Sequence, residues 1–266
     1  MSDAGNAGRT GGLLAGLRRF TPARIGLGRA GPALPTREVL AFGLAHARAR
    51  DAVHAALDVP RLLSDLAVAG ATPGGGRRGP PPVVVRSAAA DRATYLARPD
   101  LGRRLAPGEA ERLAGASEVV VLIADGLSAL AVQRHAAPLL ASLRDCSAAR
   151  WAAARVVIGL QGRVALGDEV AARLGARLVA VLIGERPGLT SPDSLGVYLT
   201  FDPRPGRTDA ERNCVSNVRP EGLPYREAAR RVDWLAAAAL ARGLTGVGLK
   251  DESDAALPAG GGAELP

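Results

Sequence analysis

The fold is decided by residues 155–223, which read RVVIGLQGRVALGDEVAARLGARLVAVLIGERPGLTSPDSLGVYLTFDPRPGRTDAERNCVSNVRPEGL. Three apolar runs in this stretch are each short, rich in Val, Ile or Leu, and have Gly or Pro beyond them. That pattern is typical of buried strands. The three predicted strands are Arg155–Leu160, Leu178–Ile183 and Leu195–Phe201.

A helix is predicted between the first two of these strands. Val164, Val170 and Leu174 suit one helical face, and Gly175 is a typical stop. Strand, helix and strand with short connections predict a right-handed parallel crossover. Ligands of open parallel sheets bind outside the carboxyl ends of the strands. The polar, glycine-bearing segments beyond these strands, QGRVALGD, GERPGL and DAERNCVSN, are therefore predicted to form a ligand-binding edge.

Strand and helix patterns continue outside this stretch. Further strands are predicted at Pro82–Ser87, Glu118–Ala124 and Thr245–Lys250. Further helices are predicted at Asp91–Ala97, Gly108–Ala114, Ser128 to about Leu143, and Pro224–Gly243, with Ser128 as an N-cap. The alternation predicts the α/β class, with a Rossmann-like, mostly parallel sheet flanked by helices and preceded by a small helical N-terminal domain.

The segment ATPGGGRRGPPP at residues 71–82 is the clearest boundary, because Gly and Pro allow neither a regular helix nor a central strand. The chain is therefore predicted to divide into a disordered N-terminus at 1–20, a helical domain with a docking arm at 21–70, the linker at 71–82, the Rossmann-like domain at 83–252 and a loose tail at 253–266.

Two helices and an arm are predicted within the N-terminal domain. The first helix runs from Thr36, a candidate N-cap, to about Leu57, and the second covers Pro60–Val68. Ala23–Pro35 is predicted to be an interaction arm. Within it, Gly26–Gly31 formally matches the dinucleotide fingerprint GxGxxG. We reject that motif, because no strand precedes it and prolines follow where a helix should begin.

The composition excludes several classes of protein. The 266 residues carry a net charge of +8, and only one of the 34 basic residues, Lys250, is a lysine. The arginine bias reflects either GC-rich coding or a surface for phosphate or an acidic partner. No basic run interleaved with aromatics indicates nucleic-acid binding. Cys146 and Cys214 form no CxxC, which favours a reducing cytosolic compartment. No apolar stretch reaches the roughly 18 residues of a membrane span.

The sequence predicts a ligand binder with no catalytic residue and no metal site of its own. No zinc spacing, P-loop or nucleophile triad is present. GLSAL resembles the hydrolase elbow GxSxG, but Leu130 replaces the second Gly, and His135 reads as a surface or interface residue. Glu185 follows a strand and is either a ligand contact or forms a solvated pair with Arg186 or a neighbour. Cys214 is either a small buried thiol or a group whose pKa is lowered by a nearby arginine.

Several segments together resemble one known family, the small (light) subunit of adenosylcobalamin-dependent ethanolamine ammonia-lyase. The resemblance extends over roughly residues 20–252. The matching segments are Gly26–His54, Ser87–Leu105, Ile123–Leu140, Gly162–Val170 (GRVALGDEV), Leu182–Leu189 (LIGERPGL), Asp193–Thr200 (DSLGVYLT) and Glu211–Leu223 (ERNCVSNVRPEGL).

The resemblance implies a function shared between two subunits. In that family adenosylcobalamin (coenzyme B12) lies between the subunits, and the small subunit covers one side of it. The large subunit, a β/α barrel, binds ethanolamine and supplies the catalytic groups for its radical conversion to acetaldehyde and ammonia. The family's cobalamin contacts match Val164, Glu185 and Cys214. Gly162, Arg163 and Gly184 flank these positions, and Gly184 is expected to let a bulky ligand approach the backbone.

The resemblance also implies a heteromer located in the cytoplasm or inside a bacterial microcompartment. No histidine fits the DxHxxG signature, so bound cobalamin is expected to keep its own benzimidazole as the lower ligand. Two other functions remain open at this point. One is a nucleotide-dependent oxidoreductase on the same sheet, which a test for NAD binding would identify. The other is a basic nucleic-acid-binding module, for which binding would weaken strongly with salt.

Overall fold

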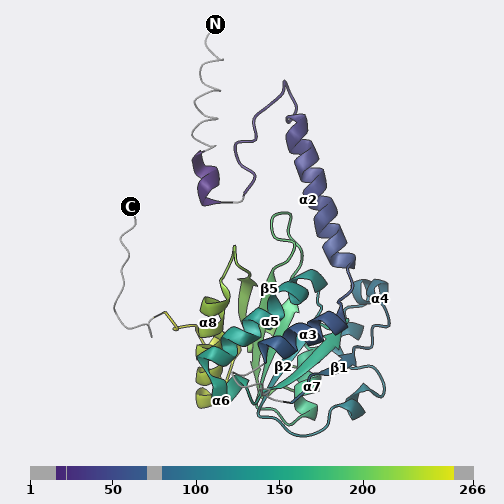
Figure 1. The fold of residues 1–266 in the computed structure, drawn as a ribbon, viewed down its shortest axis with the longest axis vertical. Coiled ribbons are helices and arrows are strands. Elements are labelled where there is room, and N and C mark those ends of the chain that lie inside the picture. The colour runs from purple at the N-terminus through teal and green to yellow at the C-terminus, as the bar shows by residue number, and fades with distance from the viewer. Residues whose placement is uncertain (1–15, 22, 71–79, 255–266) are drawn as a thin grey trace.

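The computed structural model describes residues 16–21, 23–70 and 80–254 (Figure 1). The predictions for residues 1–15, for most of the linker and for the tail from 255 onward lie outside the described residues.

One six-stranded sheet organises the described chain, in the order β1-β3-β2-β4-β5-β6. The first four strands in this order pair in parallel, whereas β5 is antiparallel to both of its neighbours. The strands are β1 (Val83–Arg86), β2 (Val119–Ala124), β3 (Arg155–Leu160), β4 (Leu178–Gly184), β5 (Leu195–Phe201) and β6 (Asn213–Val218). The class is therefore α/β, with a mixed sheet.

Helices cover both faces of the sheet (Figure 1). The helices α3, α5 and α8 pack on one face, and α7 packs on the other. Successive residues of β2 are buried alternately on the two faces, because side chains of a strand point to opposite faces in turn. The helices are α2 (Thr36–His54), α3 (Val59–Ala69), α4 (Arg92–Ala97), α5 (Ala129–Cys146), α6 (Ala148–Trp151), α7 (Leu166–Arg173) and α8 (Tyr225–Arg242), with short 3₁₀ turns η1 (Arg18–Phe20), η2 (Leu101–Arg103), η3 (Glu109–Arg112), η4 (Asp209–Glu211) and η5 (Gly246–Gly248).

The predicted parallel connection between β3 and β4 is present, and the parallel direction assumed for the third strand is wrong. The chain passes from β3 through α7 to β4, but β2 lies between these two strands. The third predicted strand, β5, follows β4 without a helix and runs antiparallel to it. A short connection permits this, because only parallel neighbours need a crossover of a dozen or more residues.

The last strand of the sheet, β6, was not predicted. Only Val215 and Val218 of its six residues are buried, because it forms one edge of the sheet. A strand with so few apolar residues shows no apolar run in the sequence. Conversely, the strand predicted at Thr245–Lys250 is wrong, because this segment forms the 3₁₀ turn η5.

The N-terminal helices do not form a core of their own in the described residues. Leu62 and Leu66 of α3 are buried in the core that α5 shares with the sheet, so a separate helical domain is not confirmed. Helix α2 projects away from the body (Figure 1), and Ala52 near its end is its one buried residue. Pro35 occupies the N-cap position of α2 without a side-chain cap, so the cap predicted at Thr36 is wrong. The cap at Ser128 is confirmed, because its hydroxyl accepts a hydrogen bond from the Ala131 amide.

Candidate functional site

The carboxyl ends of β2 and β3 are joined by one buried carboxylate. Asp125 follows β2 and accepts hydrogen bonds from the backbone amides of Gln161, at 2.9 Å, and Gly162, at 3.0 Å, which follow β3. Burial raises the pKa of Asp125. The chain leaves β2 toward α5 on one face and leaves β3 toward α7 on the other. In open α/β sheets, a ligand crevice forms where successive connections diverge in this way.

A cleft of about 400 Å³ opens beside this point. Two of the predicted contacts, Val164 and Glu185, lie together in its wall, with the flanking Arg163 and Gly184. Its other lining residues are Tyr95, Leu127, Ile183, Arg186 and Tyr198. The cleft is thus mostly apolar, with a carboxylate and two arginines.

The carboxylate of Glu185 is oriented by neighbours that the sequence did not indicate. It accepts hydrogen bonds from the Ser194 hydroxyl and, at 3.3 Å, from the Asn217 amide. A Cβ atom at Gly196 would lie 2.9 Å from a Glu185 oxygen, so glycine leaves room for the carboxylate there. Among the described residues, Arg186 makes no ion pair with Glu185, so the interpretation as a pair with Arg186 is wrong.

Cys214 lies beside the cleft but does not line it. It is on β6, directly opposite Tyr198 of β5, and not in a loop beyond a strand. Partial burial raises the pKa of the Cys214 thiol, and the nearby Glu185 carboxylate raises it further. The expectation that an arginine lowers this pKa is wrong, because Arg212 instead binds the buried Asp168. The thiol stays protonated and suits a polar contact better than nucleophilic attack.

Gly184 serves the packing of the chain. A Cβ atom at this position would lie 2.0 Å from the carbonyl oxygen of Ser128 and 2.7 Å from that of Asp125. Only glycine therefore lets the β2–α5 turn rest on the end of β4. The expectation that Gly184 makes room for a ligand is wrong, because this space is filled by backbone.

Tyr95 on α4 is a further part of the site that sequence reasoning missed. The ring is fully buried, and the guanidinium groups of Arg163 and Arg92 lie 4.3 Å and 4.8 Å from its centre. Burial raises the pKa of Tyr95 to about 12. Arg92 also donates to the carbonyl oxygen of Val53, at 2.6 Å, which ties the end of α2 to the edge of the site. The sequence indicated Tyr95 only by its position in Ser87–Leu105, a segment that matches the family.

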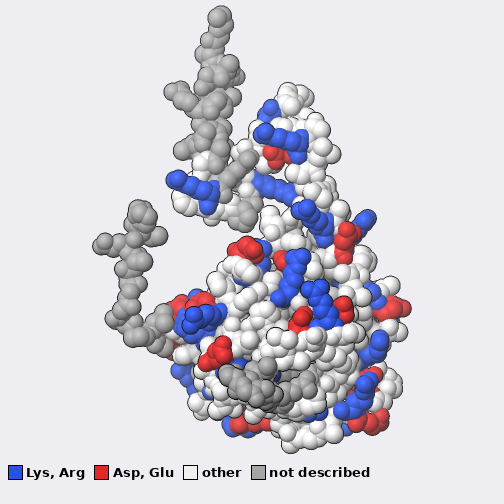
Figure 2. Space-filling model, viewed as in Figure 1, with Lys and Arg blue, Asp and Glu red and all other residues white. Residues whose placement is uncertain are grey.

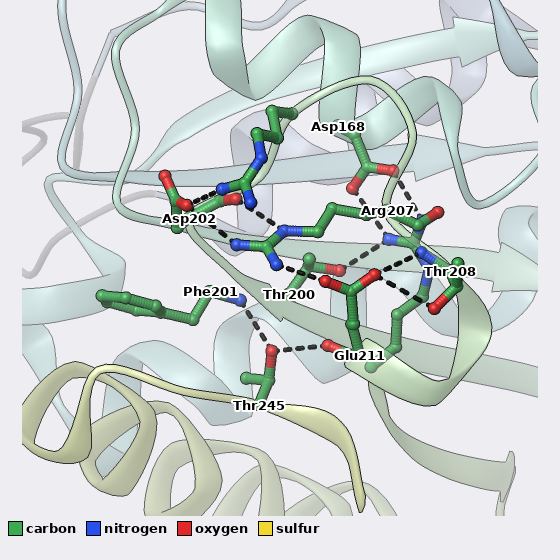
Figure 3. A network of polar contacts seen from close by, with 10 residues as sticks. Asp168, Thr200, Phe201, Asp202, Arg207, Thr208, Glu211 and Thr245 are labelled. Atoms are coloured by element: carbon green, nitrogen blue, oxygen red, sulfur yellow. Dashed lines mark hydrogen bonds and ion pairs between the residues drawn. The ribbon is translucent and has the colours of Figure 1, made fainter. Parts of the chain in front are cut away.

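A second, larger hollow of about 910 Å³ adjoins the cleft, and Arg163 and Val164 line both. We call it the arginine hollow, after Arg103, Arg104, Arg163, Arg207 and Arg212 in its lining. One wall is the segment 205–212, which a polar network holds in place (Figure 3).

His135 is buried, so its interpretation as a surface residue is wrong. Its Nδ1 lies 2.8 Å from the Tyr225 hydroxyl, and its Nε2 lies 3.5 Å from an Asp193 oxygen. Ser128 donates its hydroxyl to the carbonyl oxygen of Pro192 at 2.9 Å, away from any histidine. Ser128 and His135 therefore do not form the hydrogen bond that joins the serine and histidine of a nucleophile triad.

In residues 16–21, 23–70 and 80–254, no helix has the length and apolar character needed to cross a membrane. The same part of the chain contains no group of three or more His, Cys, Asp or Glu side chains placed to hold a metal ion.

Comparison with known proteins identifies the family. The family model described as ethanolamine ammonia-lyase light chain (EutC) matches residues 13–250. A relative from Bradyrhizobium diazoefficiens, named ethanolamine ammonia-lyase small subunit, is 54% identical over 256 residues, which span 94% of this chain and 95% of the relative. Relatives with the same name from Azotobacter vinelandii and Xanthomonas campestris pv. campestris are each 54% identical, over 254 and 247 residues. These two alignments span 92% and 90% of this chain, and 91% and 87% of the relatives. The resemblance inferred from the sequence is confirmed: the chain belongs to the ethanolamine ammonia-lyase light chain family, as the small subunit of an ammonia-lyase.

Proposed function

We propose that this subunit binds adenosylcobalamin at the carboxyl edge of its Rossmann-like sheet, where the large subunit covers the other side of the cofactor. The complex would convert ethanolamine to acetaldehyde and ammonia. The observation that carries the proposal is the cleft that holds Val164 and Glu185, with Cys214 on the adjoining strand. These are the three positions at which the sequence matches the family's cobalamin contacts.

The chemistry of the cleft suits a corrin ring. Leu127, Val164 and Ile183 offer apolar surface to a flat macrocycle, and Glu185 offers an acceptor to the amide groups at its rim. Arg163 contributes a buried Nε that has no hydrogen-bond acceptor. A ligand that supplied an acceptor there would remove the cost of an unsatisfied donor.

The residues of the cleft suit cofactor binding by this subunit and leave substrate chemistry to the large subunit. When bound, the cofactor supplies the radical chemistry of the reaction. Val164 packs against the cofactor, Glu185 accepts hydrogen bonds from it, and Cys214 makes a polar contact through its thiol or backbone. The described residues of the cleft include no acid–base pair aligned for substrate chemistry. The catalytic groups and the ethanolamine site would therefore belong to the large subunit.

The projecting helix α2 suits the contact with the large subunit. Its exposed apolar side chains are Val39, Leu40, Phe42 and Leu44. Figure 2 shows this helix as mainly uncharged and basic surface beyond the body of the molecule. Because Arg92 ties its end to the site, a partner seated on α2 and the preceding arm at 23–35 would also reach the cofactor.

The experiment measures cobalamin binding and acetaldehyde formation by the subunit alone and by its complex with the large subunit. We expect the complex to bind adenosylcobalamin and to form acetaldehyde from ethanolamine, and the isolated chain to form none. A complex that binds no cobalamin would overturn the proposal, as would acetaldehyde formation by the chain alone. NAD binding at the cleft would favour an oxidoreductase, but Gly26–Gly31 lies in the loop before α2, away from the sheet.

A further inference from the structure

Three arginines that line the arginine hollow, Arg103, Arg104 and Arg163, form no ion pair with a carboxylate of the described residues. The five arginines of the hollow face three carboxylates, those of Asp100, Glu169 and Asp209. Asp100 pairs with Arg98, which lies outside the hollow. Glu169 accepts a hydrogen bond from the Leu105 amide.

The arginines of the hollow divide into two groups. Arg207 and Arg212 are bound to carboxylates in the network of Figure 3 and form part of the wall. Arg103 and Arg104 are exposed, and their guanidinium groups make no hydrogen bond or ion pair with another described residue. These two are free to bind a ligand.

Two buried donors in the hollow also have no acceptor. The Nε atoms of Arg163 and Arg212 are both buried without a hydrogen-bond acceptor. The Arg212 side chain is only 2% exposed, and the Asp209 carboxylate lies 3.7 Å from its Nε, beyond hydrogen-bond distance. A buried donor without an acceptor is unfavourable unless a ligand or water completes it. Several guanidinium groups that converge on one space favour a phosphate group, whose oxygens match their fork of donors.

We propose that the arginine hollow is a phosphate subsite that receives the phosphodiester in the nucleotide tail of cobalamin. This assignment rests on the proposed function. The hollow and the cleft share Arg163 and Val164, so one large ligand can occupy both. GC-rich coding accounts for many arginines, but not for the convergence of five of them, from separate segments, on one hollow beside the cleft.

The test compares two ligands on the complex with the large subunit. Cobalamin has the phosphate-bearing tail, and cobinamide lacks the tail and its phosphate. The variant is the double change Arg103→Gln and Arg104→Gln. Both positions are exposed, so the change should leave the fold intact. The matched control is Arg173→Gln, an exposed arginine on α7 outside the lining of the hollow.

We expect the double variant to raise the Kd for cobalamin about tenfold or more, because two charge-assisted contacts are lost. Its Kd for cobinamide should stay within about twofold, and the control should change neither ligand. An equal loss for both ligands, or no loss for cobalamin, would overturn the assignment. If the wild-type complex binds neither ligand, the proposed function fails before the subsite is tested.

A second arm distinguishes the tail from a separate phosphate ligand. Inorganic phosphate and adenosine monophosphate are titrated into the complex with and without saturating cobalamin. We expect both to compete with cobalamin and to be excluded once it is bound, because the tail then fills the hollow. Phosphate binding that is unchanged in the cobalamin-saturated complex would show that the hollow serves a different ligand and would refute the assignment to the tail.

Discussion

Arg212 and Asp168 form a buried, two-pronged ion pair. Nη1 of Arg212 lies 2.7 Å from Oδ1 of Asp168, and Nη2 lies 2.6 Å from Oδ2. Nη1 also donates to the Thr200 hydroxyl at 2.7 Å, so α7, β5 and the segment before β6 meet at one guanidinium group (Figure 3). The pair therefore holds one wall of the arginine hollow against the sheet.

Asp168→Asn is expected to destabilise the subunit strongly. The change leaves the buried Arg212 with only the fully exposed Asp209 carboxylate, 3.7 Å from Nε, as a counter-charge. Breaking such a buried pair costs about 3–5 kcal/mol of unfolding free energy. The control is Glu118→Gln, which breaks an ion pair with Arg177 whose side chains are 62% and 55% exposed. Such exposed pairs contribute only about 0–1 kcal/mol. Urea denaturation measures the unfolding free energy of both variants. An equal loss of unfolding free energy in the two variants would contradict this prediction.

Glu185→Gln is expected to weaken cofactor binding without slowing the reaction at saturation. Glutamine keeps the size of the side chain but is a weaker acceptor, so the apparent KM for adenosylcobalamin should rise about tenfold for each 1.4 kcal/mol lost. The kcat at saturating cofactor should stay within a few-fold of wild type.

Ser194→Ala is a matched companion to this variant, because it removes one donor that orients Glu185 and keeps the carboxylate. We expect a smaller rise in the same KM. Both values come from cofactor titrations of the complex. A large fall in kcat with unchanged KM in Glu185→Gln would instead make Glu185 a catalytic group.

Leu40→Glu on α2 is expected to weaken assembly with the large subunit. Leu40 is 68% exposed, so the change should leave the fold intact while placing a charge in an apolar contact. Deleting residues 23–35 should have the same effect. The control is Val247→Glu, because Val247 is 83% exposed on η5. Gel filtration with the large subunit gives the fraction in complex, and equal fractions for Leu40→Glu and wild type would exclude α2 from the interface.

His135→Gln is expected to make stability less sensitive to mild acid. Burial lowers the pKa of His135, and this outweighs the opposing effect of Asp193; Arg134 also lowers the pKa, and Glu221 raises it. Below the ordinary value of about 6.5, the unfolded chain binds a proton that the folded chain does not. The unfolding free energy of the wild type therefore falls as pH drops through this region.

The measurement for His135 is urea denaturation at about pH 7.5 and about pH 5.5, above and below the ordinary histidine pKa. The wild type should lose more stability between these values than His135→Gln. The neighbouring Tyr225 hydroxyl contacts the same ring, so Tyr225→Phe serves as the companion variant that keeps the histidine. If the unfolding free energy depends on pH equally in the wild type and in His135→Gln, then His135 does not cause the loss of stability in mild acid.

The local sequence determined the inner strands, most helices and the neighbourhood of two site residues. The segments β3, β4 and β5 were predicted because continuous apolar runs indicate burial, which local composition records. Val164 and Glu185 were placed at one edge because the residues after parallel strands meet there. Matching segments along the chain also identify the family without reference to its fold.

Only the tertiary structure decided how these pieces pair and which polar groups meet. The antiparallel direction of β5 and the existence of β6 depend on hydrogen bonds between strands, which the pattern within a single strand does not encode. The burial of His135 and the donors to Glu185 come from segments distant in sequence. The arginine hollow likewise collects side chains from separate parts of the chain, because a cavity is defined by packing and not by local periodicity.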